Sequence, residues 1–272
     1  MKIIILLYFL VTFAFDLNSF LFCHKLTHPN SMKQTIDYTK SGSNWPGVCQ
    51  SGTLQSPISI DMYDKLESDI LDFNYGKSQG KLKWNGSFYK IDFEDNDSKA
   101  IFTYNKVKPA RTIEYVLKRL IFRTPPEHIV EGEPNDLELQ FVHDSTNKKE
   151  SNNLLIISVF AKVTDHLKTA NNWWNRINLD GDYNSSVEGV VGILTTLRDY
   201  IYYEGSQTIP NCVENVNWIV FKKSIYIGRH HFNTLKSNIC KSEFPKGNAR
   251  KLQNRNGREL VQYSLENHHN YY

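Results

Sequence analysis

Residues 112–128, TIEYVLKRLIFRTPPEH, decide the fold of this chain. Apolar side chains recur at every second position along much of residues 112–123, and Thr124, Pro125 and Pro126 come directly after Arg123. A period of two matches the alternation of side chains across a β-strand, and prolines end such runs. We therefore predict a strand from Thr112 to Arg123.

The same pattern recurs on both sides of this stretch, in runs separated by Gly, Asn, Asp and Pro. The clearest runs are Lys81 to Phe93, Ile101 to Tyr104, Leu137 to Val142, Leu154 to Val163 and Trp218 to Tyr226. Helical spacing of apolar residues is found in two stretches, Val187 to Tyr200 and about His230 to Ser237. The pattern predicts a mainly β domain with decorating helices (α+β).

Composition indicates one folded domain. The chain has 272 residues, of which 40% are hydrophobic and 13% aromatic, enough for one substantial core. We place this domain at residues 38–263, because no internal repeat or low-complexity linker divides it. The net charge of +3 comes without a dense Lys/Arg block, so we expect no nucleic-acid partner.

The first residues are typical of a secretory leader. Met1 and Lys2 precede an apolar run from Ile3 to Phe15, which is shorter than the roughly 20 residues that span a bilayer. We predict a signal peptide over residues 1–22 with an open cleavage point, in preference to an uncleaved anchor. A polar segment, 23–37, and a polar tail, 264–272, flank the domain. The mature chain is expected to be secreted or luminal, with no membrane span.

Entry into the secretory route permits disulfides and glycans. The four cysteines are Cys23, Cys49, Cys212 and Cys240, and they allow three pairings. Glycan acceptor patterns begin at Asn85, Asn96 and Asn184.

Several separated blocks, in the right order, resemble the α-carbonic anhydrases. They are Trp45 to Cys49 leading to Gln55-Ser56-Pro57-Ile58, Tyr115 to His128, Leu137 to His143, Tyr203 to Val220, and a closing stretch from Gly247 to Arg258. The resemblance implies a single α-carbonic-anhydrase-like domain on a large, mostly antiparallel central sheet. It also implies a bridge between Cys49 and Cys212, as in secreted members; Cys23 and Cys240 could then pair by elimination.

That family's chemistry needs three neutral imidazoles around Zn²⁺, with a fourth position for water. The positions of this chain that match the three ligands are Ile121, Arg123 and Gln140, and none of the three is a histidine. Ser87 stands where fast members carry a proton-shuttle histidine. We therefore predict no zinc cofactor and no carbon dioxide hydration.

The resemblance also assigns residues around the former metal positions. Thr208 and Glu127 match a catalytic hydrogen-bonded pair and are interpreted as vestigial, because a buried polar network stabilises the fold even without a metal. Glu138, His128 and Tyr203 match the layer behind the ligands, and Val142 and Trp218 match the wall of the pocket. His128 and His143 are interpreted as structural histidines.

Three functions remain open at this level. The favoured one is a noncatalytic binding or scaffold protein whose protein or surface partner is unknown. The alternative is a carbonic anhydrase with a rearranged zinc site that uses His128, His143 or Glu138. A third hypothesis is a small anion held in the pocket by Arg119 and Arg123, against which stands an internal ion pair from these arginines to Glu127 or Glu138.

Overall fold

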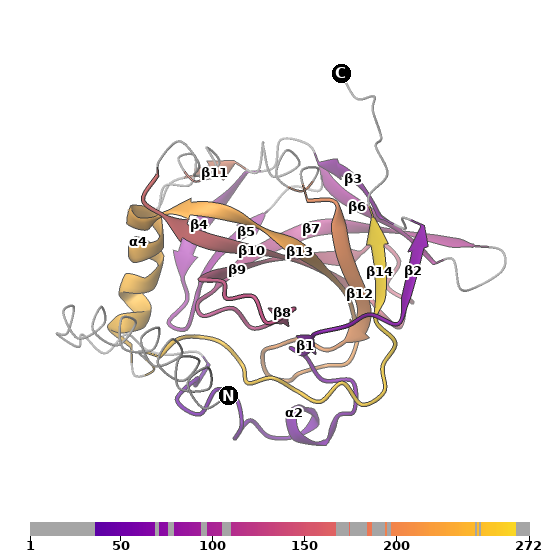
Figure 1. Cartoon of the computed structure of the whole chain (residues 1–272), viewed down its shortest axis with the longest axis horizontal. Helices are drawn as coiled ribbons and strands as arrows, with labels where there is room; N and C mark the ends of the chain where they lie inside the picture. Colours follow the sequence, from indigo (N-terminus) through magenta and orange to yellow (C-terminus); the bar gives the residue numbers. More distant parts are fainter. Residues whose placement is uncertain are drawn as a thin grey trace, which may run out of the picture.

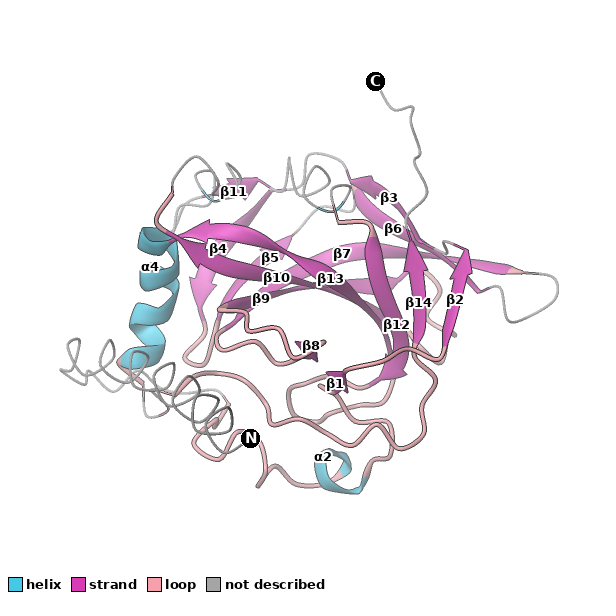
Figure 2. Ribbon diagram, viewed as in Figure 1, coloured by secondary structure: helices cyan, strands magenta, loops and turns pink. Residues whose placement is uncertain are grey.

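The computed structural model describes residues 36–68, 71–75, 79–93, 97–104, 110–166, 174, 184–186, 194, 197–242, 244 and 246–264. Within these ranges a large curved sheet dominates, and the helices α2 (Val48–Ser51) and α4 (Arg229–Cys240) lie at its margins (Figures 1 and 2). The mainly β architecture predicted from the sequence is confirmed.

Fourteen strands carry the described fold. They are β1 (Ser59–Ile60), β2 (Lys65–Ser68), β3 (Leu71–Tyr75), β4 (Gln79–Trp84), β5 (Tyr89–Phe93), β6 (Ser98–Tyr104), β7 (Arg111–Arg123), β8 (Ile129–Val130), β9 (Leu137–Ser145), β10 (Leu154–Thr164), β11 (Asn184–Ser186), β12 (Asp199–Gly205), β13 (Val216–Gly228) and β14 (Val261–Ser264). β1 and β8 form a separate parallel pair.

The other twelve strands form one sheet in the order β11-β4-β5-β7-β9-β10-β13-β12-β14-β2, and the β3-β6 pair joins β7. Within this sheet the described pairs are antiparallel except β10–β13 and β14–β2. The predicted large, mostly antiparallel sheet is therefore confirmed.

One predicted strand is a hairpin instead. The run from Lys81 to Phe93 divides into β4 and β5, which pair with each other across a turn at Asn85-Gly86. The Asn85 Oδ1 atom accepts hydrogen bonds from the backbone N–H groups of Ser87 and Phe88, at 2.9 and 2.8 Å. This Asx-type turn, with Gly86 at φ 93°, interrupts the run because asparagine and glycine favour such backbone.

The predicted helix from Val187 to Tyr200 is wrong at its end. Asp199 and Tyr200 belong to β12, where Tyr200 pairs with Phe221 of β13 and its ring stacks on Tyr263. Tertiary packing of an aromatic strand prevails here over helical periodicity. Residues 187–193 and 195–196 lie outside the described residues. The second predicted helix, His230 to Ser237, is confirmed inside α4.

A bulge in β7 decides which side chains reach the two faces of the sheet. Register with β9 shifts between Leu117 and Arg119. Leu117 and Leu120 therefore both enter the main apolar core, although three positions separate them. Beyond the bulge, Ile121 and Arg123 lie on the opposite face, where Ile121 packs in a second cluster that includes Phe88 and Trp45. The bulge therefore determines the face of the sheet on which Ile121 and Arg123 lie.

The disulfide implied by the family resemblance is present. Cys49 of α2 bonds to Cys212, 163 residues further along the chain. Cys240 is also disulfide-bonded, whereas Cys23 lies outside the described residues. Within the described ranges, no helix is long and apolar enough to cross a membrane.

Candidate functional site

The candidate site lies where the ends of β7 and β9 pair. Ile121 is directly opposite Gln140, and Arg123 is opposite Glu138. In an antiparallel pair, opposite residues and residues two positions apart share one face of the sheet. The three positions singled out from the sequence, Ile121, Arg123 and Gln140, are therefore brought together.

Arg123 is the centre of this site, and only 1% of its side chain is exposed. Its Nη1 donates to the Tyr38 hydroxyl at 2.6 Å and to the Asn248 carbonyl oxygen at 3.2 Å, and its Nη2 donates to Thr208 Oγ1 at 3.3 Å. Burial raises the pKa of Tyr38 to about 12, so its phenol stays neutral and can accept the charge-assisted bond. Three distant chain segments thus meet on one guanidinium.

The Arg123 Nε atom faces the carboxylate side of the site. It lies 3.3 Å from Glu127 Oε2 and donates to Gln140 Oε1 at 3.2 Å. The guanidinium also stands over the Phe88 ring, with its carbon 4.8 Å from the ring centroid. A buried cation is therefore paired, hydrogen-bonded and stacked, which are the conditions under which burial of an ion is tolerated.

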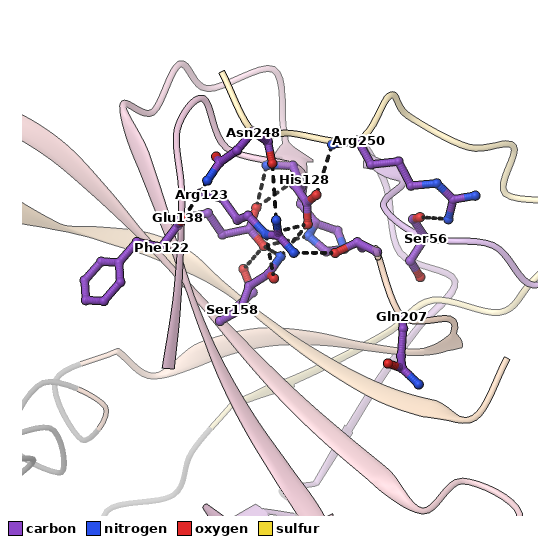
Figure 3. Close-up of polar contacts among 12 residues, drawn as sticks. Ser56, Phe122, Arg123, His128, Glu138, Ser158, Gln207, Asn248 and Arg250 are labelled. Carbon is purple, nitrogen blue, oxygen red and sulfur yellow. Dashed lines mark hydrogen bonds and ion pairs between the residues drawn. The ribbon is translucent and has the colours of Figure 1, made fainter. Parts of the chain in front are cut away.

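Gln140 joins two buried carboxylates. Its Nε2 donates to Glu127 Oε2 at 2.7 Å and to Glu138 Oε1 at 3.0 Å. Burial alone would raise the pKa of Glu138, but the positive potential of His128 and the hydrogen bonds from His128 and Gln140 outweigh it and lower this pKa to about 2. Glu138 therefore stays ionised, and Figure 3 shows it beside Arg123, His128 and Ser158.

His128 continues the network away from the arginine. Its Nδ1 lies 2.9 Å from Glu138 Oε1, and its Nε2 lies 2.6 Å from the Tyr203 hydroxyl. Tyr203 in turn donates to Ser56 Oγ at 3.0 Å, and burial raises the pKa of this tyrosine. The fully buried Trp218 packs edge-on against the His128 ring, with centroids 4.6 Å apart. Both ring nitrogens of His128 are therefore engaged.

Thr208 and Glu127, which the resemblance matched to a hydrogen-bonded pair, contact other partners in the structure. Thr208 Oγ1 accepts from Arg123, while Glu127 accepts from Gln140 and, through Oε1, from the backbone N–H of Arg250 at 3.0 Å. Ser87 is buried, and its Oγ donates to the Ile36 carbonyl oxygen at 2.8 Å. Val142 is partly buried and packs against the apolar cluster that contains Ile121.

Arg119 does not reach this site, contrary to the sequence-based expectation. Its Nε bonds to Asp92 Oδ1 at 2.7 Å on the neighbouring strand β5, and the side chain is half-buried near the surface. Arg119 is on the same face of β7 as Ile121 and Arg123, but it lies four residues before Arg123 and directly opposite Asp92, whose carboxylate holds it there. His143 is also outside the site: its Nε2 contacts the Tyr75 hydroxyl and its Nδ1 lies 3.2 Å from the Leu155 carbonyl oxygen.

Sequence reasoning missed three partners of Arg123, namely Tyr38, Phe88 and the Asn248 carbonyl. Tyr38 and Asn248 are 85 and 125 residues away from Arg123 in sequence. No local pattern announces such contacts. One signal was available: a buried arginine needs several acceptors, so residues of the entry and closing segments were candidates.

The glycan acceptor residues have separate surroundings. Asn85 forms the β4–β5 turn described above. Asn184 is in β11, at one edge of the sheet, and Asn96 lies outside the described residues. Within the described ranges, no group of three or more His, Cys, Asp or Glu side chains is arranged to hold a metal ion.

Fold and site together match a known family. The model of the eukaryotic-type carbonic anhydrases matches residues 40–264, and the chain belongs to this family.

Among curated relatives, dioscorin DB3L of Dioscorea polystachya is 29% identical over 213 residues, covering 76% of this chain and 74% of that protein. Carbonic anhydrase Nec1 of Nesocodon mauritianus is 25% identical over 224 residues, covering 79% of this chain and 76% of that protein.

Solved structures agree. A crystal structure of dioscorin complexed with ascorbate superposes with a TM-score of 0.65 at 25% identity, covering 86% of this chain and 100% of that one. The α-carbonic anhydrase of Photobacterium profundum gives a TM-score of 0.66 at 22% identity, covering 83% of this chain and 99% of that one, and this similarity concerns the fold.

Proposed function

We propose that this chain is a secreted, noncatalytic carbonic-anhydrase-like protein with a binding or scaffold role. In this proposal Ile121, Arg123 and Gln140 stand where catalytic members hold zinc. Ile121 has no lone pair, a guanidinium is cationic at any physiological pH, and an amide oxygen is a poor ligand for zinc. These side chains do not fit the metal.

The observation that carries the proposal is the complete engagement of Arg123. Its three nitrogens contact Tyr38, Asn248, Thr208, Gln140 and Glu127, and the side chain is buried. A permanent positive charge fixed in this position opposes the binding of a second cation at the same place. Thr208 and Glu127, which match catalytic residues in the resemblance, are used here to stabilise the guanidinium.

The alternative, a zinc site rearranged around His128, His143 or Glu138, has less support. His128 uses both ring nitrogens in hydrogen bonds to Glu138 and Tyr203. Burial lowers the pKa of His143 to about 4, so it is neutral, but its two nitrogens face Tyr75 and Leu155. A zinc ion with Zn–N distances of about 2 Å would require several of these contacts to break.

The anion hypothesis is also less supported. Arg123 is paired with Glu127, which is the internal ion pair set against anion binding, and Arg119 is paired with Asp92. Ascorbate is nevertheless the natural small acid to test, since a related dioscorin was solved with it. We expect neither ascorbate nor bicarbonate to raise the melting temperature through Arg123.

Secretion and glycosylation belong to the same proposal. A disulfide between Cys49 and Cys212 is compatible with an oxidising compartment. The leader-like first residues and the three acceptor asparagines support this route. We propose that the partner is a protein or a surface. The polar side chains of the site are buried and bonded to one another, so a partner would bind on the outside of the domain.

The proposal is tested on the secreted full chain. After dialysis against zinc, we expect less than one-tenth of an equivalent of zinc per chain and no carbon dioxide hydration above the uncatalysed rate. Carbonic anhydrase Nec1, handled identically, serves as the positive control for the hydration assay. One zinc per chain, together with turnover that a chelator abolishes, would refute the proposal.

A further inference from the structure

The strand β2 ends the large sheet. It pairs with β14 on one side, and among the described residues no strand pairs with its other side (Figure 1). Such an edge presents backbone N–H and C=O groups in a row, ready to pair with another strand. Proteins usually protect an edge of this kind with charge, proline or a covering segment.

Exposed apolar side chains surround this edge. Leu66 in the middle of β2 is 64% exposed, and Met62 and Tyr63 just before it are 77% and 42% exposed. Lys222 contacts the Tyr63 ring and also bonds to Gln262, the residue of β14 next to Leu66. Tyr63 and Leu66 therefore lie on the same side of the sheet, and large apolar side chains beside an open edge mark an interaction surface.

We propose that β2 is a dimerisation edge on which a second copy of this chain docks antiparallel, with Leu66 on the two-fold axis. In this register Leu66 is opposite Leu66 of the second copy. Lys65 is opposite Glu67 of the second copy, and Glu67 opposite its Lys65. Two opposite-charge pairs and one apolar pair form at once, as an isologous interface requires.

Neighbouring registers are worse. A shift by one residue in one direction places Leu66 opposite Glu67, and a shift in the other places Asp64 opposite Glu67, which brings two negative charges together. Lys65 is paired with Glu259 at 2.5 Å in the single chain, but its side chain is half exposed. An exposed ion pair contributes little, so Lys65 can exchange it for Glu67 of the second copy.

The register is tested by cross-linking. Directly opposite residues in an antiparallel pair have Cα atoms about 4.5–5.5 Å apart, inside the range of a disulfide. The Leu66→Cys variant should therefore form a covalent dimer on mild oxidation. Two variants serve as controls. In Glu67→Cys the new cysteine does not lie opposite the same residue of the second copy, and Leu252→Cys replaces a leucine that is 40% exposed elsewhere on the surface. Equal cross-linking by all three variants would overturn the register.

The charges are tested by sedimentation equilibrium. Lys65→Glu or Glu67→Lys alone places like charges opposite each other twice and should weaken the dimer at least tenfold, or about 1.4 kcal/mol. The double exchange Lys65→Glu/Glu67→Lys should return the dissociation constant to within about threefold of the original. Circular dichroism confirms that each variant is folded. An unmodified chain that stays monomeric at about 100 μM, or a double exchange that fails to recover, contradicts the proposal.

Discussion

Replacing Arg123 by methionine removes the charge at the centre of the site while keeping a similar length and an apolar body. Glu127 then remains as a buried carboxylate without its counter-ion, and Tyr38, Thr208 and the Asn248 carbonyl each lose a donor. Removing one member of a buried ion pair typically destabilises a protein by about 3–5 kcal/mol. We expect that range for the Arg123→Met variant.

Urea unfolding followed by circular dichroism measures this change. In thermal unfolding of a domain of this size, each kcal/mol of lost stability lowers the melting temperature by about 2–4 °C. The melting temperature should therefore fall by about 6–20 °C. The matched control is Arg119→Met, on the same strand and also paired with a carboxylate. Because the Arg119–Asp92 pair is partly exposed, this control should change stability by about 1 kcal/mol or less.

A second variant separates the ion pair from simple packing. Glu127→Gln removes the opposite charge, and in the double variant no unpaired charge remains. The double variant should therefore be more stable than the sum of the single effects predicts, by about 1–3 kcal/mol. If Arg123→Met changes stability no more than Arg119→Met, or if the two substitutions are additive, the guanidinium does not have the role assigned to it.

Three further predictions concern the disulfide, the positions matched to zinc ligands, and His143. Replacing Cys49 and Cys212 together by serine opens a 163-residue loop and should lower the free energy of unfolding by about 5 kcal/mol in the chain-entropy model; an unchanged urea midpoint would contradict this. Arg123→His alone should bind no zinc, whereas Ile121→His, Arg123→His and Gln140→His combined should bind about one equivalent on elemental analysis; tight binding by the single variant would show that the assigned ligand positions are wrong. His143 has a pKa of about 4 in the folded chain against an ordinary value of 6.5, so the unfolded chain binds this proton first, and stability present above pH 6.5 is lost as the pH falls towards 4. Between pH 6.5 and pH 4 the free energy of unfolding of His143→Gln should fall by about 3 kcal/mol less than that of the unmodified chain. If urea unfolding at the two pH values shows the same fall for both chains, the assignment is refuted.

The central strands were predictable because their sequence satisfies local and global requirements together. The predicted runs inside β7 and β9 mix apolar with polar residues, those inside β10 and β13 are mostly apolar, and the structure buries all four in the middle of the sheet. The strands β2 and β14 were missed. They are short, lie towards the edge and carry polar residues such as Lys65 and Gln262, so their pairing depends on neighbours far along the chain.

The site was predictable in part. Family resemblance brought together Arg123, Gln140 and Glu138, and the strand register places them on one face. The ion pair of Arg119 was not predictable, because its partner Asp92 is on the neighbouring strand β5 and no local pattern in the sequence marks that contact. Tyr38 and Asn248 were missed as partners because their contacts with Arg123 span 85 and 125 residues.

Those two contacts also set an order of events during synthesis. Asn248 is the 125th residue after Arg123, and until it leaves the ribosome the guanidinium lacks one of its acceptors. Domains fold during synthesis only as far as the emerged chain allows. The buried guanidinium at the end of β7 is therefore fully paired only when the closing segment is present. A ribosome stalled before residue 248 should hold a chain whose Arg123 is still accessible to arginine-specific reagents.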